Sequence, residues 1–218
     1  IPLSIDCLDY SYDITEQQPQ LFITKDFKSL TNLLDKISSS MAYKVGGIKG
    51  INKAIESKSI CTIELDSGIQ VSGKSSDFIS LKDTIVYMQL KGPTQLCYNN
   101  FEIKGHGTKR HKEGFGFPIG QLIDGLKINK LNKTTFINLG YKIGKYIKLK
   151  FKSGLRLEGS IESILEKSDL IKIITFSECT VKYNSQILFD PSWGEYDMIC
   201  GQNIVSVFGG PSDIDQYF

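Results

Sequence analysis

A short β-hairpin motif that occurs twice is the feature that most constrains the fold of this chain. Residues 63–73 read Ile-Glu-Leu-Asp-Ser-Gly-Ile-Gln-Val-Ser-Gly, and residues 149–159 read Leu-Lys-Phe-Lys-Ser-Gly-Leu-Arg-Leu-Glu-Gly. Apolar and polar residues alternate in both segments, and this period of two predicts half-buried strands. A three-residue loop sets Leu65 opposite Ile69 and gives Gly68 the left-handed conformation of a bulged turn.

The similarity between the two copies extends beyond the hairpin. An offset of 86 residues carries Gly68 onto Gly154, and the loss of one residue then brings Tyr98 onto Tyr183. The same offset of 86 aligns Phe78 with Ile164, Asp83 with Asp169, Ile85 with Ile171, Met88 with Ile174 and Leu90 with Phe176. This pattern predicts two copies of one small antiparallel module of four or five strands, of the SH3-like barrel type. The alternative is two unrelated hairpins that share a common turn.

We therefore expect an α+β chain that is mostly β, with a first β-module at 46–125 and a second at 126–218. Thr134 is expected to cap a short helix that Gly140 ends, just before the second module. Residues 204–208 are expected to form the last strand, after an aromatic loop around Trp193. A glycine-rich connector is expected at 104–118.

The composition limits the classes of function. Lysine plus arginine (26) nearly balances aspartate plus glutamate (24), so the net charge of +2 gives no general attraction to nucleic acid or to a membrane surface. We expect neither partner, because the chain also has no apolar run that could span a bilayer. An odd number of cysteines without a C-x-x-C pair favours a reducing, cytoplasmic location: Cys7, Cys61, Cys97, Cys179 and Cys200.

The first 45 residues follow a different pattern. Apolar residues recur at steps of three and four between Phe27 and Met41, which predicts a helix over about 26–41 after a strand at 21–23. A shorter helical pattern at 48–55 leads into the first module.

The segment Tyr-Asp-Ile-Thr-Glu-Gln-Gln-Pro-Gln-Leu-Phe-Ile at 12–23 resembles the end of the catalytic domain of the pterin-dependent aromatic amino acid hydroxylases. Gln18-Pro19 and Phe27 fall where that family places them, and the leading Ile-Pro-Leu is similar to its lead-in. The resemblance covers about 45 of the 218 residues. The repeat region resembles the long C-terminal extension of some bacterial members of the family.

The resemblance implies that residues 1–45 close a catalytic domain and that the upstream catalytic domain of the same polypeptide is the main partner. The family uses Fe(II), held by two histidines and a carboxylate, with molecular oxygen and tetrahydropterin to hydroxylate phenylalanine. These ligands are expected upstream of Ile1, so this chain alone is expected to hold no cofactor and to be inactive. The β-modules are expected to serve regulation, partner binding or formation of a homo-oligomer.

Tyr12 and Glu16 are the two residues that the resemblance places near the active site. Tyr12 is expected to line the pocket, and Glu16 to hold a hydrogen bond behind the iron ligands. The alternative is that both residues only order the strand and helix that close the domain.

His106 and His111 have the four-residue gap of the family's iron-binding pair, and Glu113 follows closely. They occur after the Gln-Pro segment rather than before it, and Lys109 and Arg110 lie between them. Positive charge opposes a divalent cation, so a solvated connector is expected here rather than a metal site. The same basic residues could contact an anion or RNA, but a short charged run is more often a solvated loop.

Two functional hypotheses follow. In the first, the chain is the C-terminal region of a phenylalanine hydroxylase that carries two β-modules. In the alternative, it is a stand-alone interaction protein of two tandem barrels whose N-terminal helix packs on the first barrel, with no enzyme attached. It would capture a partner at an exposed strand edge or at the Trp193 loop.

Overall fold

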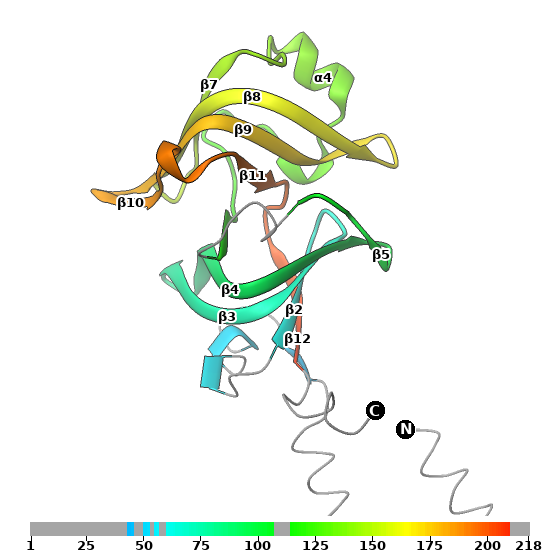
Figure 1. The fold of residues 1–218 in the computed structure, drawn as a ribbon, viewed down its shortest axis with the longest axis vertical. Helices are drawn as coiled ribbons and strands as arrows, with labels where there is room; N and C mark the ends of the chain where they lie inside the picture. The colour runs from blue at the N-terminus through cyan, green and yellow to red at the C-terminus, as the bar shows by residue number, and fades with distance from the viewer. Residues whose placement is uncertain (1–42, 46–49, 53–54, 57–59, 107–113, 210–218) are drawn as a thin grey trace, which may run out of the picture. The chain divides into compact units, whose positions relative to one another are not determined.

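The computed structural model describes residues 43–45, 50–52, 55–56, 60–106 and 114–209. The expected strand at 21–23 and helix at 26–41 lie outside this part of the chain. Residues 50–52 and 55–56 are helical, and Ile51 is fully buried. The chain is mostly β, and its antiparallel strands curl strongly (Figure 1).

The strands form two antiparallel sheets. The first sheet has the order β1-β12-β2-β3-β4-β5, and β6 also pairs with β4. The bounds of these strands are β1 Tyr43–Val45, β2 Ile60–Leu65, β3 Ile69–Leu81, β4 Thr84–Tyr98, β5 Phe101–Glu102, β6 Phe115–Pro118 and β12 Ile204–Gly209. The second sheet has the order β10-β9-β8-β7, and β11 pairs with β9. Its strands are β7 Tyr146–Lys150, β8 Leu155–Lys167, β9 Leu170–Tyr183, β10 Gln186–Phe189 and β11 Tyr196–Ile199.

Among the described residues, three further short helical segments lie between the later strands: η1 Ile128–Lys130, α4 Lys133–Asn138 and η2 Pro191–Trp193. The cap of α4 is Asn132, whose side chain accepts a hydrogen bond from the backbone N–H of Thr135. The expectation that Thr134 caps this helix was therefore wrong, because an asparagine two residues earlier already has the extended backbone that a cap requires. Gly140 follows the helix with φ +84°, as expected. Within the described part of the chain, no helix is both long enough and apolar enough to span a membrane.

The internal repeat is confirmed by the strand registers. Strands β2 to β6 recur as β7 to β11 in the same order. The β3–β4 pair shifts register at 72/74, 75/77 and 79/80, and the β8–β9 pair shifts at 158/160, 161/163 and 165/166, each 86 residues later. Gly92 with φ +70° becomes Glu178 with φ +50° at the same offset. Two unrelated hairpins would not share three bulges, so the shared-turn alternative is excluded.

The hairpin turns have the expected geometry. The N–H of Gly68 donates to the carbonyl of Leu65 at 2.9 Å, and the N–H of Gly154 donates to the carbonyl of Phe151 at 3.0 Å. Gly68 has φ +82° and Gly154 has φ +92°, which places both in the left-handed region.

The two halves exchange chain segments with each other. β12 follows β11 of the second half but pairs with β2 of the first, with Ile204 opposite Leu65. In the reciprocal direction, the segment after β6 crosses to the second half, where Leu122 pairs with Phe151. The range 126–218 thus contributes its last strand to the sheet of the range 46–125.

The exchange also repeats in its hydrogen bonds. The N–H of Asp66 donates to the carbonyl of Asn203 at 3.0 Å, and the N–H of Lys152, 86 residues after Asp66, donates to the carbonyl of Gln121 at 2.8 Å. The two crossing segments therefore make equivalent backbone hydrogen bonds at the point where each first meets the other half. They differ afterwards, because β12 continues along β2 whereas the first crossing leaves β7 after Ile123.

Each half also contributes side chains to the other's core. Tyr87 and Ile79 pack in the core formed mainly by the second half, and their repeat equivalents Ile173 and Leu165 pack in the core of the first half. The two cores are therefore not independent, and we expect residues 60–209 to unfold as one cooperative unit.

Candidate functional site

Several of the polar side chains that the fold buries lie where the two halves meet, and we refer to this region as the junction. It includes β6, β11 and the β2–β3 turn. The phenol of Tyr196 is fully buried and donates to the carbonyl of Gly116 on β6 at 2.8 Å. Burial raises the pKa of Tyr196 well above its usual value, and the neighbouring Tyr87 raises it further. Tyr196 is therefore a neutral hydrogen-bond donor that ties β11 to β6 at physiological pH.

The absence of a Cβ atom at Gly116 leaves room for two neighbouring side chains. A Cβ atom built there would clash with the hydroxyl of Tyr87 and with Oε1 of Gln89. The repeat equivalent of Gly116 on β11 is Asp197, so the two halves differ in chemistry at this position. The carboxylate is thus a feature of one half only.

Asp197, His106 and Thr175 form the most distinctive polar group at the junction. The Asp197 side chain is fully buried, and its Oδ1 accepts a hydrogen bond from the Thr175 hydroxyl at 2.7 Å. Nδ1 of His106 lies 3.2 Å from the same oxygen, and the His106 side chain is 13% exposed. His106 comes from the loop after β5, so this contact joins the first half to the second.

Lys172 is a further buried ionisable residue at the junction. Its side chain is 2% exposed and donates to the backbone carbonyl of Ser67 at 2.6 Å. The ammonium also lies 4.5 Å from the centre of the Tyr98 ring, and the Tyr98 hydroxyl donates to Ser168 at 3.2 Å. A buried ammonium needs such partners to offset its desolvation. Lys172 therefore fixes the β2–β3 turn of the first half against β9 of the second.

Asp66 organises the other side of the same turn. One carboxylate oxygen accepts the backbone N–H of Gln202, and the other accepts the side-chain amides of Asn129 and Asn203, all at 2.9 Å. Three donors from two separate segments hold this carboxylate in place. These hydrogen bonds fix the start of β12 against the β2–β3 turn, and we call the group of Asp66, Asn129, Gln202 and Asn203 the clasp.

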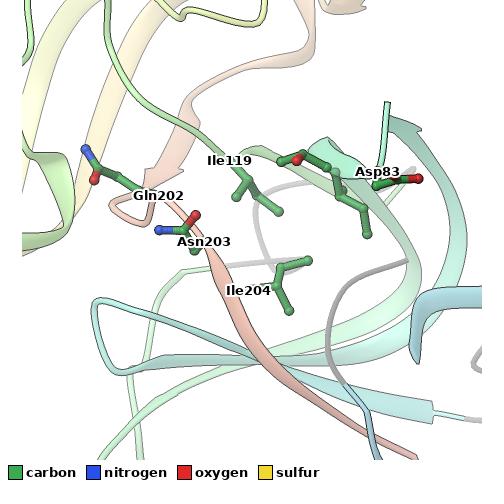
Figure 2. A pocket seen from close by; sticks show the side chains of 7 residues that line it. Asp83, Ile119, Gln202, Asn203 and Ile204 are labelled. Carbon is green, nitrogen blue, oxygen red and sulfur yellow. The ribbon is translucent and has the colours of Figure 1, made fainter. Parts of the chain in front are cut away.

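A cavity of about 180 Å³ lies beside this clasp (Figure 2). Ile85, Ile119 and Ile204 line it together with Asp83, Thr84, Gln202 and Asn203. Figure 2 shows the amide of Gln202 directed away from the isoleucines, and the amide of Asn203 already bonds Asp66. The cavity is smaller than the sites that usually hold organic ligands, so we assign it no ligand.

The predicted site residues have different outcomes. Tyr12, Glu16, His111 and Glu113 lie outside the described residues, so their predictions remain untested. His106 is described and faces Asp197. Among the described residues, no group of three or more histidine, cysteine, aspartate or glutamate side chains is arranged to hold a metal ion. Trp193 is 51% exposed and packs edge-on against Phe189 with ring centres 5.5 Å apart.

Sequence reasoning did not find Asp197 or Lys172 as buried junction residues. Each is a charged residue within a short, largely apolar run of strand residues, at 171–176 and 196–199. A charge inside a fully buried strand is a signal that could have been used, because such residues are rarely buried without a partner.

The reactivity of the cysteine thiols tests whether both halves bury these side chains in the folded protein. Cys61, Cys179 and Cys200 are buried, whereas Cys97 is partly exposed. Burial raises the pKa of Cys61 to about 11 and that of Cys200 to about 12, so neither forms the reactive thiolate at pH 8. In a Cys7→Ser variant, we expect Ellman's reagent to label Cys97 in the native protein and all four thiols in urea. Rapid native labelling of Cys200 would contradict the buried junction.

Comparisons of the chain with protein-family models and with curated proteins found no match.

Proposed function

We propose that residues 42–209 form a binding and assembly module, and that the chain is the C-terminal region of a cytoplasmic, pterin-dependent aromatic amino acid hydroxylase. The observation that carries the first part is the reciprocal exchange between the two halves. It joins the two halves into one unit, and among the described strands the outer edges of the two sheets are left without a full partner strand. The second part rests on the resemblance of residues 12–27 to the end of the hydroxylase catalytic domain.

Each half is proposed to be an SH3-like barrel. Support comes from the five strands of each half, with two long bent strands at the centre, and from the strand or segment that the other half adds beside the first strand. Small barrels of this kind have many functions, so the type of barrel alone does not choose among them.

The hydroxylase proposal is tested by extending the chain. A protein that continues through the natural coding sequence upstream of Ile1 is compared with residues 1–218 alone. We expect the extended protein to bind iron and to hydroxylate phenylalanine with tetrahydropterin, and residues 1–218 to do neither. Pterin-dependent turnover by residues 1–218 alone, or no iron and no turnover in the extended protein, would overturn this proposal.

The alternative is a stand-alone interaction protein whose N-terminal helix packs on the first barrel, and deletion of residues 1–41 distinguishes it from the hydroxylase proposal. Contacts within the chain group residues 42–218 into one unit with its own core, which supports the hydroxylase proposal. Residues 42–218 alone are therefore expected to keep the thermal midpoint of the full chain. The cut is made before β1, which pairs with β12 and belongs to the module. A marked fall in that midpoint, together with absence of hydroxylase activity in the extended protein, would favour the stand-alone alternative.

A further inference from the structure

Three basic side chains lie in one row across the second sheet, where β7, β8 and β9 run side by side (Figure 1). Lys150 on β7 is directly opposite Arg156 on β8, and Arg156 is directly opposite Lys182 on β9. Directly opposite residues point to the same face of a sheet, and all three side chains are exposed. The residues on either side of them along each strand pack in the core, so the row is on the outer face. We refer to Lys150, Arg156 and Lys182 as the basic row.

The charge of the basic row is not neutralised within the described part of the chain. None of its three side chains forms an ion pair with a described carboxylate. Glu158 is on the same face of β8, but it pairs with Lys148 at 3.3 Å. The neighbouring Lys152 is held by the side chain of Gln121 at 2.8 Å. Like charges at directly opposite positions repel, so the basic row destabilises the sheet when no anion is bound to it.

The equivalent row in the first half shows that the fold does not require these cations. The offset of 86, reduced to 85 after the lost residue, carries Glu64, Gln70 and Cys97 onto the basic row. These residues are paired in the same way, with Glu64 opposite Gln70 and Gln70 opposite Cys97. The same three strands therefore form with one carboxylate and no cation in this row. The positive charge distinguishes the surface of one half from that of the other, which points to a ligand rather than to a need of the sheet.

The spacing of the basic row fits a compact anion. Adjacent strands are about 4.8 Å apart, so the three cations span about 10 Å of the sheet surface. Carboxylates on one face of an extended protein segment are about 6.8 Å apart, whereas neighbouring phosphoryl groups share a bridging oxygen and carry their charges closer together. The guanidinium of Arg156, at the centre of the row, offers two parallel N–H donors to one phosphoryl group. The lysines on either side are point charges that suit the same kind of ligand.

We propose that the basic row binds a compact anion that carries several phosphoryl groups, either a free oligophosphate or the phosphate chain of a nucleotide. Arg156 holds the central phosphoryl group, and Lys150 and Lys182 neutralise the charge on either side of it. This inference goes beyond the proposed function and does not depend on the hydroxylase resemblance. Because the bound anion also removes the repulsion within the row, it stabilises the folded protein.

Inorganic tripolyphosphate is the probe for this proposal. Its binding to residues 1–218 is measured by isothermal titration calorimetry without divalent cations, at a low ionic strength that sodium chloride keeps constant. We expect one tripolyphosphate per chain, and we expect the same anion to raise the thermal midpoint of the protein. A titration with ATP distinguishes the two sources of the phosphoryl groups. Equal affinities assign the phosphoryl chain alone, and tighter binding of ATP assigns a nucleotide.

Single charge removals locate the site. Arg156→Gln is expected to weaken tripolyphosphate binding about tenfold, because it removes the charged pair of donors. Without the anion, this variant is expected to unfold at or above the wild-type temperature, because it relieves the repulsion within the row. Lys182→Gln is expected to weaken binding several-fold. Lys167→Gln removes the same charge at the other end of β8, so it is the matched control and is expected to bind as the wild type does.

Three results would overturn the inference. Absence of tripolyphosphate binding at low ionic strength would leave the basic row as a solvated charged surface. Equal weakening by Arg156→Gln and Lys167→Gln would show a general electrostatic attraction rather than a site. Tighter binding of a single-stranded RNA than of tripolyphosphate would assign the row to a nucleic acid instead of a compact anion. The iron and turnover assays of the extended protein test the hydroxylase proposal separately from all three.

Discussion

Removal of residues 203–218 is expected to unfold both halves of the molecule. This truncation takes away β12, which is a central strand of the first sheet between β1 and β2, together with the fully buried Val207. It also removes the Asn203 amide from Asp66 and the Ser206 hydroxyl from Glu64, a contact of 2.8 Å. The folding free energy that is lost with a central strand is expected to exceed the roughly 5–15 kcal/mol by which a typical domain is stable.

Urea denaturation followed by far-UV circular dichroism and Trp193 fluorescence tests this expectation. Trp193 lies in the second half, so its signal reports whether that half unfolds when a strand of the first half is removed. A chain that ends at Gly209 keeps β12 and is expected to have an unchanged midpoint. If the chain without residues 203–218 unfolds at the same urea concentration as the full chain, this result would contradict the strand exchange.

A pair of point variants tests the same strand without truncation. Val207→Asp places a charge in the core of the first half and is expected to destabilise the protein severely, because an unpaired buried charge is not tolerated. Val205, two residues earlier on β12, is 54% exposed, so Val205→Asp is the matched control and is expected to have little effect.

Asp197→Ala is expected to produce the second large loss, about 3–5 kcal/mol, because removal of one member of a buried polar group leaves the others without their partner. The substitution leaves the Thr175 hydroxyl, 1% exposed, and Nδ1 of His106 without the carboxylate oxygen that lies 2.7 Å and 3.2 Å away. It also opens a cavity between the two halves.

The comparison with Asp197→Asn identifies the cause. Asparagine keeps an oxygen that accepts the Thr175 hydrogen bond, so this variant is expected to lose clearly less stability than the alanine variant. The free energy of unfolding in urea is the measurement. An alanine variant as stable as the wild type would show that the group does not hold the halves together.

The fold was predictable where local rules decided it. Alternation of apolar and polar residues located the repeated hairpin, and the offset of 86 located the strands that follow it. Gly68 and Gly154 gave the turn type, because glycine adopts the left-handed conformation at low cost. These features depend on residues close together in sequence.

The strand exchange was not predictable by the same rules. Residues 204–208 read as a strand, but the sequence pattern is the same whether that strand pairs with β7 or with β2. The choice depends on where the chain crosses after β11, where Asp66 binds the backbone of Gln202 and the side chain of Asn203. Long-range pairings of this kind leave no local signal.

The polar group at the junction was not predictable from the sequence for a related reason. Asp197 and His106 are 91 positions apart in the sequence, and only the exchange brings β11 close to the loop after β5. His106 attracted notice for its spacing from His111, whereas its contact is with a carboxylate of the other half.

Disulfide trapping of β12 tests the central claim most directly. Glu64→Cys with Ser206→Cys places thiols on paired residues of β2 and β12, and cross-strand partners in antiparallel sheets lie within the Cα separation that a disulfide spans. Lys150 is the repeat equivalent of Glu64, so Lys150→Cys with Ser206→Cys represents a chain in which the last strand stays in its own half. Under mild oxidation, peptide mapping by mass spectrometry is expected to find the 64–206 bond and no 150–206 bond. A 150–206 bond without the 64–206 bond would contradict the exchange of strands between the two halves.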